Sequence, residues 1–365
     1  MGYRKSMRTM LSLGSLLVGI FVLTGCNLNG DPGNVGPDVY AGGYSINSEG
    51  VHVPGYWKNG TWNSLPPLDV TKGAYVFSLV VDGTDLYGGG VCTISSDVRV
   101  PGYWKNGTWN DLPPLDITKT ANVYSLVVDG TDVYAGGYST NSEGVDVPGY
   151  WKNGTWNGLP PLDVTKTANV YSLVVDGTDV YAGGYSTNSE GVNVPGYWKN
   201  GTWNGLPPLD VTKGAYVFPL VVDGTDVYGG GACTISSDVN VPGYWKNGTW
   251  NGLPPLDITK HSTVSSLVVD GIDVYVAGSC INSSDVFVPG YWKNGTWNGL
   301  SPLDATKGAT VYSLVVDGTD VYGGGACVNS SDVGIPGYWK NGTWNSLPPL
   351  DVKKHAEAFS LVVCE

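Results

Sequence analysis

The residues that could do chemistry in this chain are few. There are three histidines (His52, His261 and His355), six cysteines, and aspartates paired in Asp-Gly-Thr-Asp segments such as Asp129 to Asp132. Calcium needs six to eight oxygen ligands, so two carboxylates on a tight turn fall short. No Ser-His-Asp arrangement, His-Glu-x-x-His helix or Cys-x-x-Cys pair is evident. We therefore predict no catalytic residues, no metal and no cofactor.

The elements that must position these residues are repeated. The nonapeptide Pro-Gly-Tyr-Trp-Lys-Asn-Gly-Thr-Trp recurs at intervals of 47 residues, which indicates a repeat architecture. Its seven copies begin at Pro54, Pro101, Pro148, Pro195, Pro242, Pro289 and Pro336. Each unit is rich in Gly, Pro, Val, Thr, Tyr and Trp, which disfavour helices and favour strands and turns.

One unit, read from residue 123, predicts four strands. They are expected at residues 123–128, 132–138, 145–151 and 155–159. Asp129-Gly130 and Asn153-Gly154 are hairpin signals, and Pro160-Pro161 ends the ladder because proline has no amide hydrogen to donate. Four antiparallel strands in a repeat of this length are typical of a propeller blade.

The two ends of the repeat array are complementary. The last copy ends in an inner strand, residues 360–365, with no second strand after it, and the first copy begins at Asp38 with a second strand and no inner strand before it. We therefore predict that the C-terminal strand completes the first blade, which removes the exposed edges of an open array. The predicted fold class is all-β, a seven-bladed β-propeller over residues 38–365.

The repeat resembles kelch-type propellers. In the third unit the matching residues are Tyr134, Gly136, Gly137, Tyr150, Trp156, Leu159, Pro160 and Pro161. The chain departs from that pattern in its Tyr-Trp-Lys-Asn-Gly segment and in the sixth unit, which reads Val276-Ala277-Gly278 instead of a glycine pair. The resemblance implies the fold and hardly implies a function, because propellers serve many tasks.

Residues 1–25 are identified as a secretory signal. Arg4, Lys5 and Arg8 precede an apolar stretch that is too short to span a membrane. The stretch ends in Leu-Thr-Gly-Cys, which resembles the bacterial lipobox, and the resemblance implies cleavage before Cys26 and lipid, including palmitate, on that residue. An ordinary secretory signal and an uncleaved anchor are the alternatives.

The lipobox resemblance also implies a location. Residues 26–37 would be the lipidated cysteine and a flexible tether rich in Gly, Pro and Asn. We expect a protein of the bacterial cell envelope, at the outer membrane or cell surface, that contacts the membrane only through the lipid on Cys26.

The mature chain is strongly acidic. Removing residues 1–25 leaves 16 basic and 32 acidic residues, and Arg99 is the only arginine that remains. Such a charge repels phosphate backbones, so we predict no nucleic-acid partner. The lack of further arginines also argues against a sialidase, which holds its substrate carboxylate with three of them.

One repeat position alternates between cysteine and serine. The cysteines are Cys92, Cys233, Cys280 and Cys327, and the serines are Ser45, Ser139 and Ser186. Equivalent positions in neighbouring blades are expected about 10 Å apart, too far for a disulfide, so the pattern predicts small buried thiols. Cys364 replaces an aspartate and has no evident partner in the sequence.

The copies differ mainly in two connections, one before the third strand and one between blades. Strand alternation places both on one rim of the disc and both constant hairpins on the other. Loops on a rigid scaffold commonly carry function, so we predict that the variable rim binds the ligand; unconstrained drift is the alternative. The candidate residues are His52, Arg99, Asp146, Asn193, Asn240, Phe287, Tyr75, Tyr216, His261 and His355.

These observations favour a monomeric, non-enzymatic binding or interaction module with an unknown protein or carbohydrate ligand. One alternative is a glycan-processing enzyme that uses Asp or Glu with the rim histidines, for which His261 and His355 are expected to flank the inner strands of adjacent blades. A second alternative is a structural subunit of an envelope complex.

Overall fold

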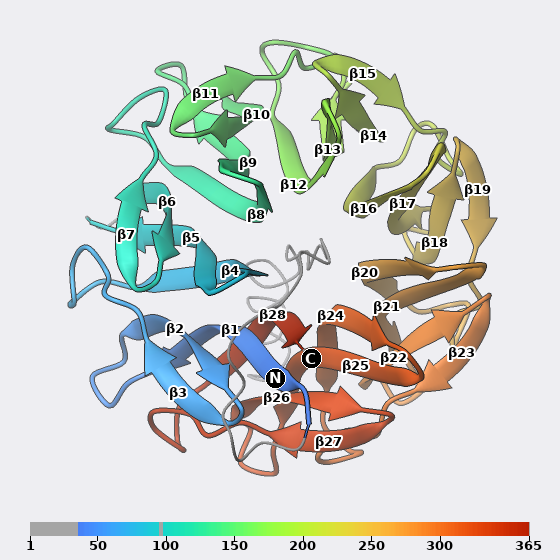
Figure 1. The fold of residues 1–365 in the computed structure, drawn as a ribbon. Helices are drawn as coiled ribbons and strands as arrows, with labels where there is room; N and C mark the ends of the chain where they lie inside the picture. Colours follow the sequence, from blue (N-terminus) through green and yellow to red (C-terminus); the bar gives the residue numbers. More distant parts are fainter. Residues whose placement is uncertain (1–35, 95–97, 365) are drawn as a thin grey trace.

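The computed structural model describes residues 36–94 and 98–364 of the 365-residue chain. Seven four-stranded antiparallel sheets surround a common axis (Figure 1). This confirms the predicted seven-bladed β-propeller. The predicted signal peptide and Cys26 lie outside the described residues.

Each blade contains an inner, a second, a third and an outer strand, counted from the axis. Blade 1 consists of β28 (Ala356–Cys364), β1 (Asp38–Ile46), β2 (His52–Lys58) and β3 (Thr61–Ser64). Blade 2 consists of β4 (Ala74–Asp82), β5 (Asp85–Thr93), β6 (Arg99–Lys105) and β7 (Thr108–Asp111). Blade 3 consists of β8 (Ala121–Asp129), β9 (Asp132–Thr140), β10 (Asp146–Lys152) and β11 (Thr155–Gly158).

The remaining blades repeat this order. Blade 4 consists of β12 (Ala168–Asp176), β13 (Asp179–Thr187), β14 (Asn193–Lys199) and β15 (Thr202–Gly205). Blade 5 consists of β16 (Ala215–Asp223), β17 (Asp226–Thr234), β18 (Asn240–Lys246) and β19 (Thr249–Gly252). Blade 6 consists of β20 (Ser262–Asp270), β21 (Asp273–Ile281), β22 (Phe287–Lys293) and β23 (Thr296–Gly299), and blade 7 of β24 (Ala309–Asp317), β25 (Asp320–Val328), β26 (Gly334–Lys340) and β27 (Thr343–Ser346).

The C-terminal strand closes the ring. β28 pairs antiparallel with β1 from Asp38 opposite Cys364 to Ser45 opposite Ala356. The first and last strands of the chain therefore share one sheet, as the counting of repeats predicts.

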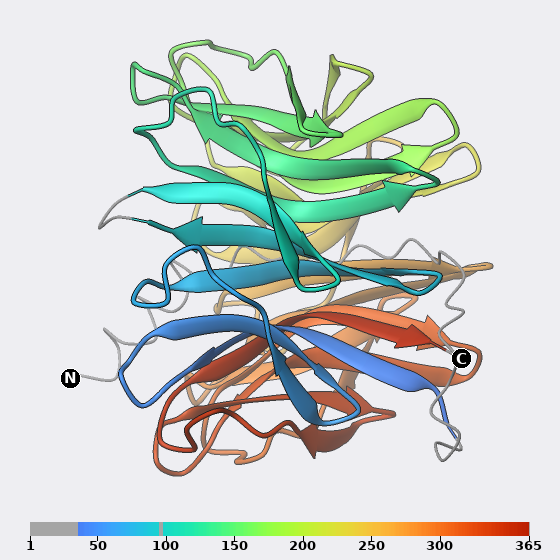
Figure 2. The ribbon, with the colours of Figure 1, turned by 60° about the vertical axis from the view of Figure 1, so that its left-hand side comes forward.

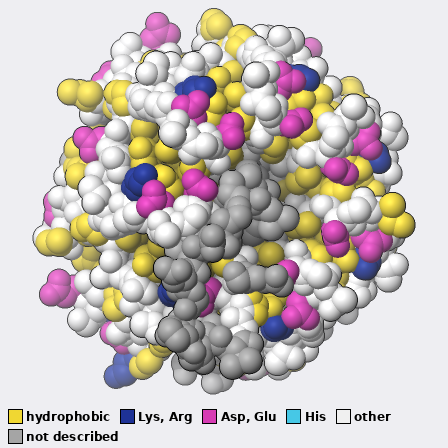
Figure 3. All heavy atoms as spheres, viewed as in Figure 1, with side chains coloured by type: hydrophobic (Ala, Val, Ile, Leu, Met, Phe, Trp, Pro, Cys, Tyr) yellow, Lys and Arg dark blue, Asp and Glu magenta, His cyan; other side chains and the backbone are white. Residues whose placement is uncertain are grey.

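Both hairpin turns of every blade lie on one rim, here called the constant rim. In blade 2 the amide of Asn106, in the third-to-fourth turn, donates to the carbonyl of Leu86, next to the first turn, at 2.9 Å. Lys105 and Asp85 form an ion pair at 2.8 Å. Its equivalents are Lys58–Asp38, Lys152–Asp132, Lys199–Asp179, Lys246–Asp226, Lys293–Asp273 and Lys340–Asp320. Figure 3 shows this face, with basic and acidic side chains next to one another around the disc.

The other two connections lie on the opposite, variable rim. The amide of Thr93, at the end of β5, donates to the carbonyl of Gly73, just before β4, at 3.0 Å. This bond joins the two connections that differ between copies. Figure 2 shows the strands running between the two rims. The predicted division into a constant and a variable rim is confirmed.

The blades are joined by hydrogen bonds from buried tryptophans. Trp104 of β6 is 1% exposed, and its indole Nε1 donates to the carbonyl of Pro66 in the preceding link at 2.8 Å. The other six donors are Trp57, Trp151, Trp198, Trp245, Trp292 and Trp339. An indole N–H that is buried needs an acceptor, so each Leu-Pro-Pro link, and the Leu-Ser-Pro link before blade 7, is fixed to the next blade.

Every inner strand contains a β-bulge opposite a glycine. In blade 3 the pairing of β8 with β9 shifts between Val123 and Ser125, which leaves Tyr124 unpaired. A Cβ placed on Gly137 would lie 1.8 Å from the carbonyl oxygen of Asn122. The bulge therefore brings backbone too close for any side chain, and glycine occupies this position in all seven copies.

The first glycine of the pair is less constrained. A Cβ on Gly136 would meet the side chain of Leu173, not backbone, and a side chain can shift. This explains why the sixth unit carries Ala277 at that position and keeps Gly278 after it.

Candidate functional site

Six aromatic residues surround the axis at the level of the bulges, and we name them the aromatic collar. The collar consists of Phe77, Tyr124, Tyr171, Phe218, Tyr312 and Phe359, each left unpaired by its bulge. Neighbouring rings contact one another with centroids 5.1–5.8 Å apart, from Tyr312 through Phe359 and round to Phe218. These separations lie in the favourable range for aromatic pairs.

The collar is interrupted at blade 6. Ser265 occupies the seventh position and donates its hydroxyl to the carbonyl of Val311 in blade 7 at 2.6 Å. In most blades a serine of the inner strand accepts the amide of a leucine in the next blade, as Ser78 does for Leu126 at 3.2 Å. On the inner strand of blade 5, Pro219 replaces this serine. Blade 6 therefore lacks the aromatic ring of the collar, and blade 5 lacks the serine that bonds to the next blade.

A second layer lies on the variable-rim side of the collar. It is made by cross-strand pairs between each inner strand and its second strand, and these pairs differ between the blades except in blades 3 and 4, which both pair asparagine with tyrosine. From blade 1 to blade 7 they are Glu357–Tyr44, Tyr75–Val91, Asn122–Tyr138, Asn169–Tyr185, Tyr216–Ala232, Thr263–Ser279 and Thr310–Ala326. Blades 1 to 5 each contribute a tyrosine, whereas blades 6 and 7 contribute only small side chains.

Three predicted rim residues, His52, Tyr75 and Arg99, meet at the junction of blades 1 and 2. The His52 ring lies 5.2 Å from the Tyr75 ring, and the Arg99 guanidinium lies over the Tyr75 ring at 6.0 Å from its centroid. The charge of His355 lowers the pKa of His52, although burial of His52 is the larger cause. Tyr44, which was not among the candidates, contacts both His52, at 4.8 Å, and Tyr75, at 5.3 Å.

Glu357 is the functional candidate that sequence reasoning missed. It is 6% exposed on β28, where burial raises its pKa to about 7, although a hydrogen bond from the Tyr312 hydroxyl opposes that shift. In turn its charge raises the pKa of Tyr44, after the larger effect of burial. The signal was present in the sequence, because Glu357 is the one carboxylate among Tyr, Asn and Thr at its repeat position.

Two amide side chains line the neighbouring part of this layer. Asn122 donates to the Tyr138 hydroxyl, and Asn169 donates to the Tyr185 hydroxyl at 2.7 Å. The Oδ1 atoms of both asparagines are buried and have no hydrogen-bond partner in the described part of the chain. Burial, followed by the charge of Asp146, raises the pKa of Tyr138 to about 12.

The other predicted rim residues are held by local bonds. Asp146 accepts from the Thr140 hydroxyl at 2.7 Å, and Asn193 donates to the Tyr216 hydroxyl at 3.2 Å. His261 accepts the amide of Asn240 at 3.2 Å. Phe287 is partly exposed at the start of β22 in blade 6, so the structure does not bring it together with Tyr75 and Arg99 of blade 2.

The expected pairing of His261 with His355 is wrong. His261 precedes β20 in blade 6 and His355 precedes β28 in blade 1, so blade 7 lies between them. The two residues are 94 positions apart, which is two repeat units. Each accepts an amide from the start of a third strand, and that of Gly334 lies 2.8 Å from His355 Nδ1.

The cysteine position is buried as predicted. Cys92, Cys233, Cys280 and Cys327 are free and completely buried. Burial raises the pKa of the Cys92 thiol to about 12, so it stays protonated at neutral pH. The equivalent Ser139 accepts the amide of Leu115 at 2.8 Å, and Cys92 accepts that of Leu68, which explains why serine and cysteine alternate.

Cys364, by contrast, is disulfide-bonded. The expectation that Cys364 has no partner is therefore wrong. Comparison of equivalent repeat positions could not find this bond.

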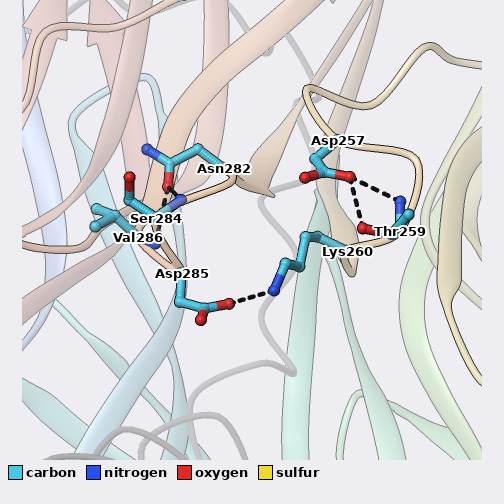
Figure 4. A network of polar contacts seen from close by, with 7 residues as sticks. All are labelled: Asp257, Thr259, Lys260, Asn282, Ser284, Asp285 and Val286. Atoms are coloured by element: carbon cyan, nitrogen blue, oxygen red, sulfur yellow. Dashed lines mark hydrogen bonds and ion pairs between the residues drawn. The ribbon is translucent and has the colours of Figure 1, made fainter.

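The exposed loops of the variable rim are also ordered by their own bonds. In blade 6, Asn282 accepts the amides of Ser284 and Val286, and Lys260 forms an ion pair with Asp285 at 2.6 Å (Figure 4). Equivalent ion pairs are Lys213–Asp238 in blade 5 and Lys307–Asp332 in blade 7. In blades 1, 3 and 4 glycine takes the place of this aspartate, so the two kinds of loop divide the rim into different sectors.

Among residues 36–94 and 98–364, no group of three or more His, Cys, Asp or Glu side chains is arranged to hold a metal ion. No helix in the same ranges has the length and apolar character needed to cross a bilayer. No known protein family matches the chain. No curated protein gives a significant match to it.

Proposed function

We propose that this protein is a non-enzymatic binding or interaction module of the bacterial cell envelope, with a protein or glycan ligand at the axial part of the variable rim. The observation that supports this best is the place where seven-fold repetition breaks down. The constant rim repeats one ion pair and two turns in every blade. The layer above the collar has six different residue pairs in seven blades, since only blades 3 and 4 share one, and a ligand without seven-fold symmetry requires such unequal contacts.

The physical character of this layer suits recognition. Tyrosine rings offer large contact area with few rotatable bonds, and polar atoms beside them orient a ligand. The rings of Tyr75 and His52 are partly exposed, while Tyr44 is 7% exposed beneath them. The ligand would therefore meet a rigid aromatic surface at the junction of blades 1 and 2.

A glycan-processing enzyme is the alternative that one observation favours. A carboxyl group whose pKa is raised can serve as a general acid, and Glu357 is such a group. Glycoside hydrolysis ordinarily needs a second carboxyl group. Asp146, whose pKa is also raised by burial, is two blades away in blade 3.

The kelch-type and lipoprotein assignments belong to the same proposal. β1 begins at Asp38, whose carboxylate pairs with Lys58 on the constant rim. A lipid on Cys26 would thus be joined to the constant rim by residues 27–37, which reach roughly 20 Å as a flexible chain. The variable rim would then face away from the membrane.

Mass spectrometry of the protein purified from bacterial membranes tests the anchor. We expect an N-terminal Cys26 peptide that carries acyl chains, and a Cys26→Ser variant that is released into the soluble fraction. An unmodified Cys26 peptide from membrane-bound protein would contradict the lipoprotein assignment.

Replacing Arg99, Phe287 and Tyr75 together by alanine tests the rim. We expect the triple variant, made on residues 27–365, to lose at least about tenfold in affinity for a ligand found by glycan array or by pull-down from envelope extract, because aromatic and arginine side chains dominate binding energies. The matched control replaces Lys105, Lys199 and Lys246 of the constant rim by alanine. Wild-type affinity in the rim variant would reject this site, and turnover of a bound glycan would favour the enzyme.

A further inference from the structure

Glu357 is a buried carboxyl group beside which the described part of the chain places no cation. Its side chain accepts the Tyr312 hydroxyl, and within the described part of the chain it forms no salt bridge. A buried carboxylate is costly unless a cation or several hydrogen bonds compensate it. Once Glu357 is ionised, its negative charge therefore has no cation beside it in the described part of the chain, and a positive ligand group would supply one.

Aromatic rings from four strands gather around this carboxyl group. Tyr44 is its direct cross-strand partner, and Tyr312 is its hydrogen-bond donor. Phe359 lies two residues further along β28 and contacts Tyr44 at 5.6 Å, Tyr312 at 5.3 Å and Phe77 at 5.8 Å. The faces of aromatic rings attract cations, most strongly where water is excluded.

This chain already places cations on tyrosine rings in every blade. On the constant rim a lysine lies over a tyrosine, as Lys152 does over Tyr134 at 4.8 Å from the ring centroid. The other pairs are Lys58–Tyr40, Lys105–Tyr87, Lys199–Tyr181, Lys246–Tyr228, Lys293–Tyr275 and Lys340–Tyr322. In each of these an aspartate accompanies the lysine, as Asp132 accompanies Lys152. Glu357 with Tyr44 and Tyr312 offers the carboxylate and the rings, but no lysine.

We infer that the junction of blades 7, 1 and 2 binds an organic ammonium group, with Glu357 as its counter-charge and Tyr44, Tyr75 and Tyr312 as its aromatic wall. This inference deepens the proposed binding function and rests on it. It names the chemical class of the ligand group, an amine or quaternary ammonium carried by a small molecule or a glycan. His52 and Tyr75, the partly exposed members of the cluster, mark the side from which the ligand enters.

A neutral sugar is the competing ligand class, and the charges argue against it. Hydroxyl groups could bond to Glu357 and stack on the rings, but they would leave the carboxylate charge uncompensated. The basic and titratable groups nearby are Arg99 over Tyr75, and His52 and His355, whose pKa values are lowered by burial. Neutral histidines leave the negative charge of Glu357 in place.

Choline and its neutral isostere 3,3-dimethylbutan-1-ol are the probes, measured by calorimetric titration at pH 8 on residues 27–365. We expect wild-type protein to bind choline at least about tenfold more tightly than the alcohol, and Glu357→Gln to remove that difference. Asp129→Asn, which removes one exposed carboxylate of the constant rim, is the matched control and should bind choline as the wild type does.

The pH dependence supplies a second readout. The pKa of Glu357 is about 7 in the folded protein, above its ordinary value near 4.5, so the carboxylate is available to a cation only as the pH rises through 7. Choline affinity should therefore fall about tenfold between pH 8 and pH 6 in the wild type and stay level in Glu357→Gln. Without ligand, Glu357 should make the wild-type protein less stable as the pH rises from 5 to 8, because the folded state holds the extra proton, and Glu357→Gln should lose this contribution.

The ammonium inference and the proposed binding function can fail separately. Equal binding of choline and the alcohol, no binding of choline to the wild type, or a Glu357-dependent preference for neutral sugars would each overturn the ammonium inference. If the triple rim variant still loses its ligand in those cases, the binding function stands without this inference. If choline binds as expected and the rim variant keeps wild-type affinity for the ligand found by array or pull-down, the ammonium site stands and that ligand is shown to bind elsewhere than at the predicted rim residues.

Discussion

Deletion of residues 356–365 is expected to abolish cooperative folding of the propeller. The deletion removes β28, so β1 loses its partner from Asp38 to Ser45 and blade 1 is left without an inner strand. It also removes Phe359 from the collar and the fully buried Leu361. A ring that cannot close exposes strand edges on both sides of the gap. Thermal unfolding followed by circular dichroism should show no transition, or one lowered by tens of degrees.

Point substitutions make this prediction quantitative. Leu361→Ala should cost about 2–5 kcal/mol of unfolding free energy, because Leu361 is completely buried. Leu350→Ala makes the same change on a side chain that is 46% exposed in the same copy, and should cost much less. Cys364→Ser shows how much of the deletion's effect belongs to the disulfide. A deletion variant that melts like the wild type would mean that closure by β28 does not stabilise the ring.

The three consecutive glycines of β5 are expected to respond to alanine in a steep order. A Cβ on Gly90 would lie 1.9 Å from the carbonyl oxygen of Tyr75, one on Gly89 would lie 3.1 Å from the Cβ of Leu126, and one on Gly88 would lie 3.4 Å from Val76. Gly90→Ala should therefore cost about 3 kcal/mol or more, since backbone must move. Gly89→Ala should cost less, because at 3.1 Å its nearest neighbour needs to move by only a few tenths of an ångström.

Gly88→Ala is the internal control of this series. Blades 1, 3 and 4 carry Ala41, Ala135 and Ala182 at the same position, so the substitution should change the unfolding free energy by less than about 1 kcal/mol. Urea unfolding of the three variants gives the comparison, since they share one strand and one chemical change. Equal losses at Gly88 and Gly90 would show that the bulge does not impose the glycine.

The sequence alone determined the repeat and its closure. Seven copies at one interval, two hairpin signals per copy and the complementary ends at Asp38 and residues 360–365 leave few ways to assemble the strands. The predicted strands match β8, β9, β10 and β11 to within two residues at each end. Turn chemistry is local, so Asn153 and Gly154 could be read directly, and both have the positive φ that their turn requires.

Only the tertiary structure decided which side chains meet at the axis. A strand pattern of period two does not reveal a bulge, and the bulge at Tyr124 changes which residues face the axis after it. Glu357 and Tyr44 are more than three hundred positions apart, and Tyr75 and Tyr312 come from two other blades. The sequence shows which repeat position each of these residues occupies. The burial and the pKa of Glu357, however, depend on neighbours that only ring closure brings together.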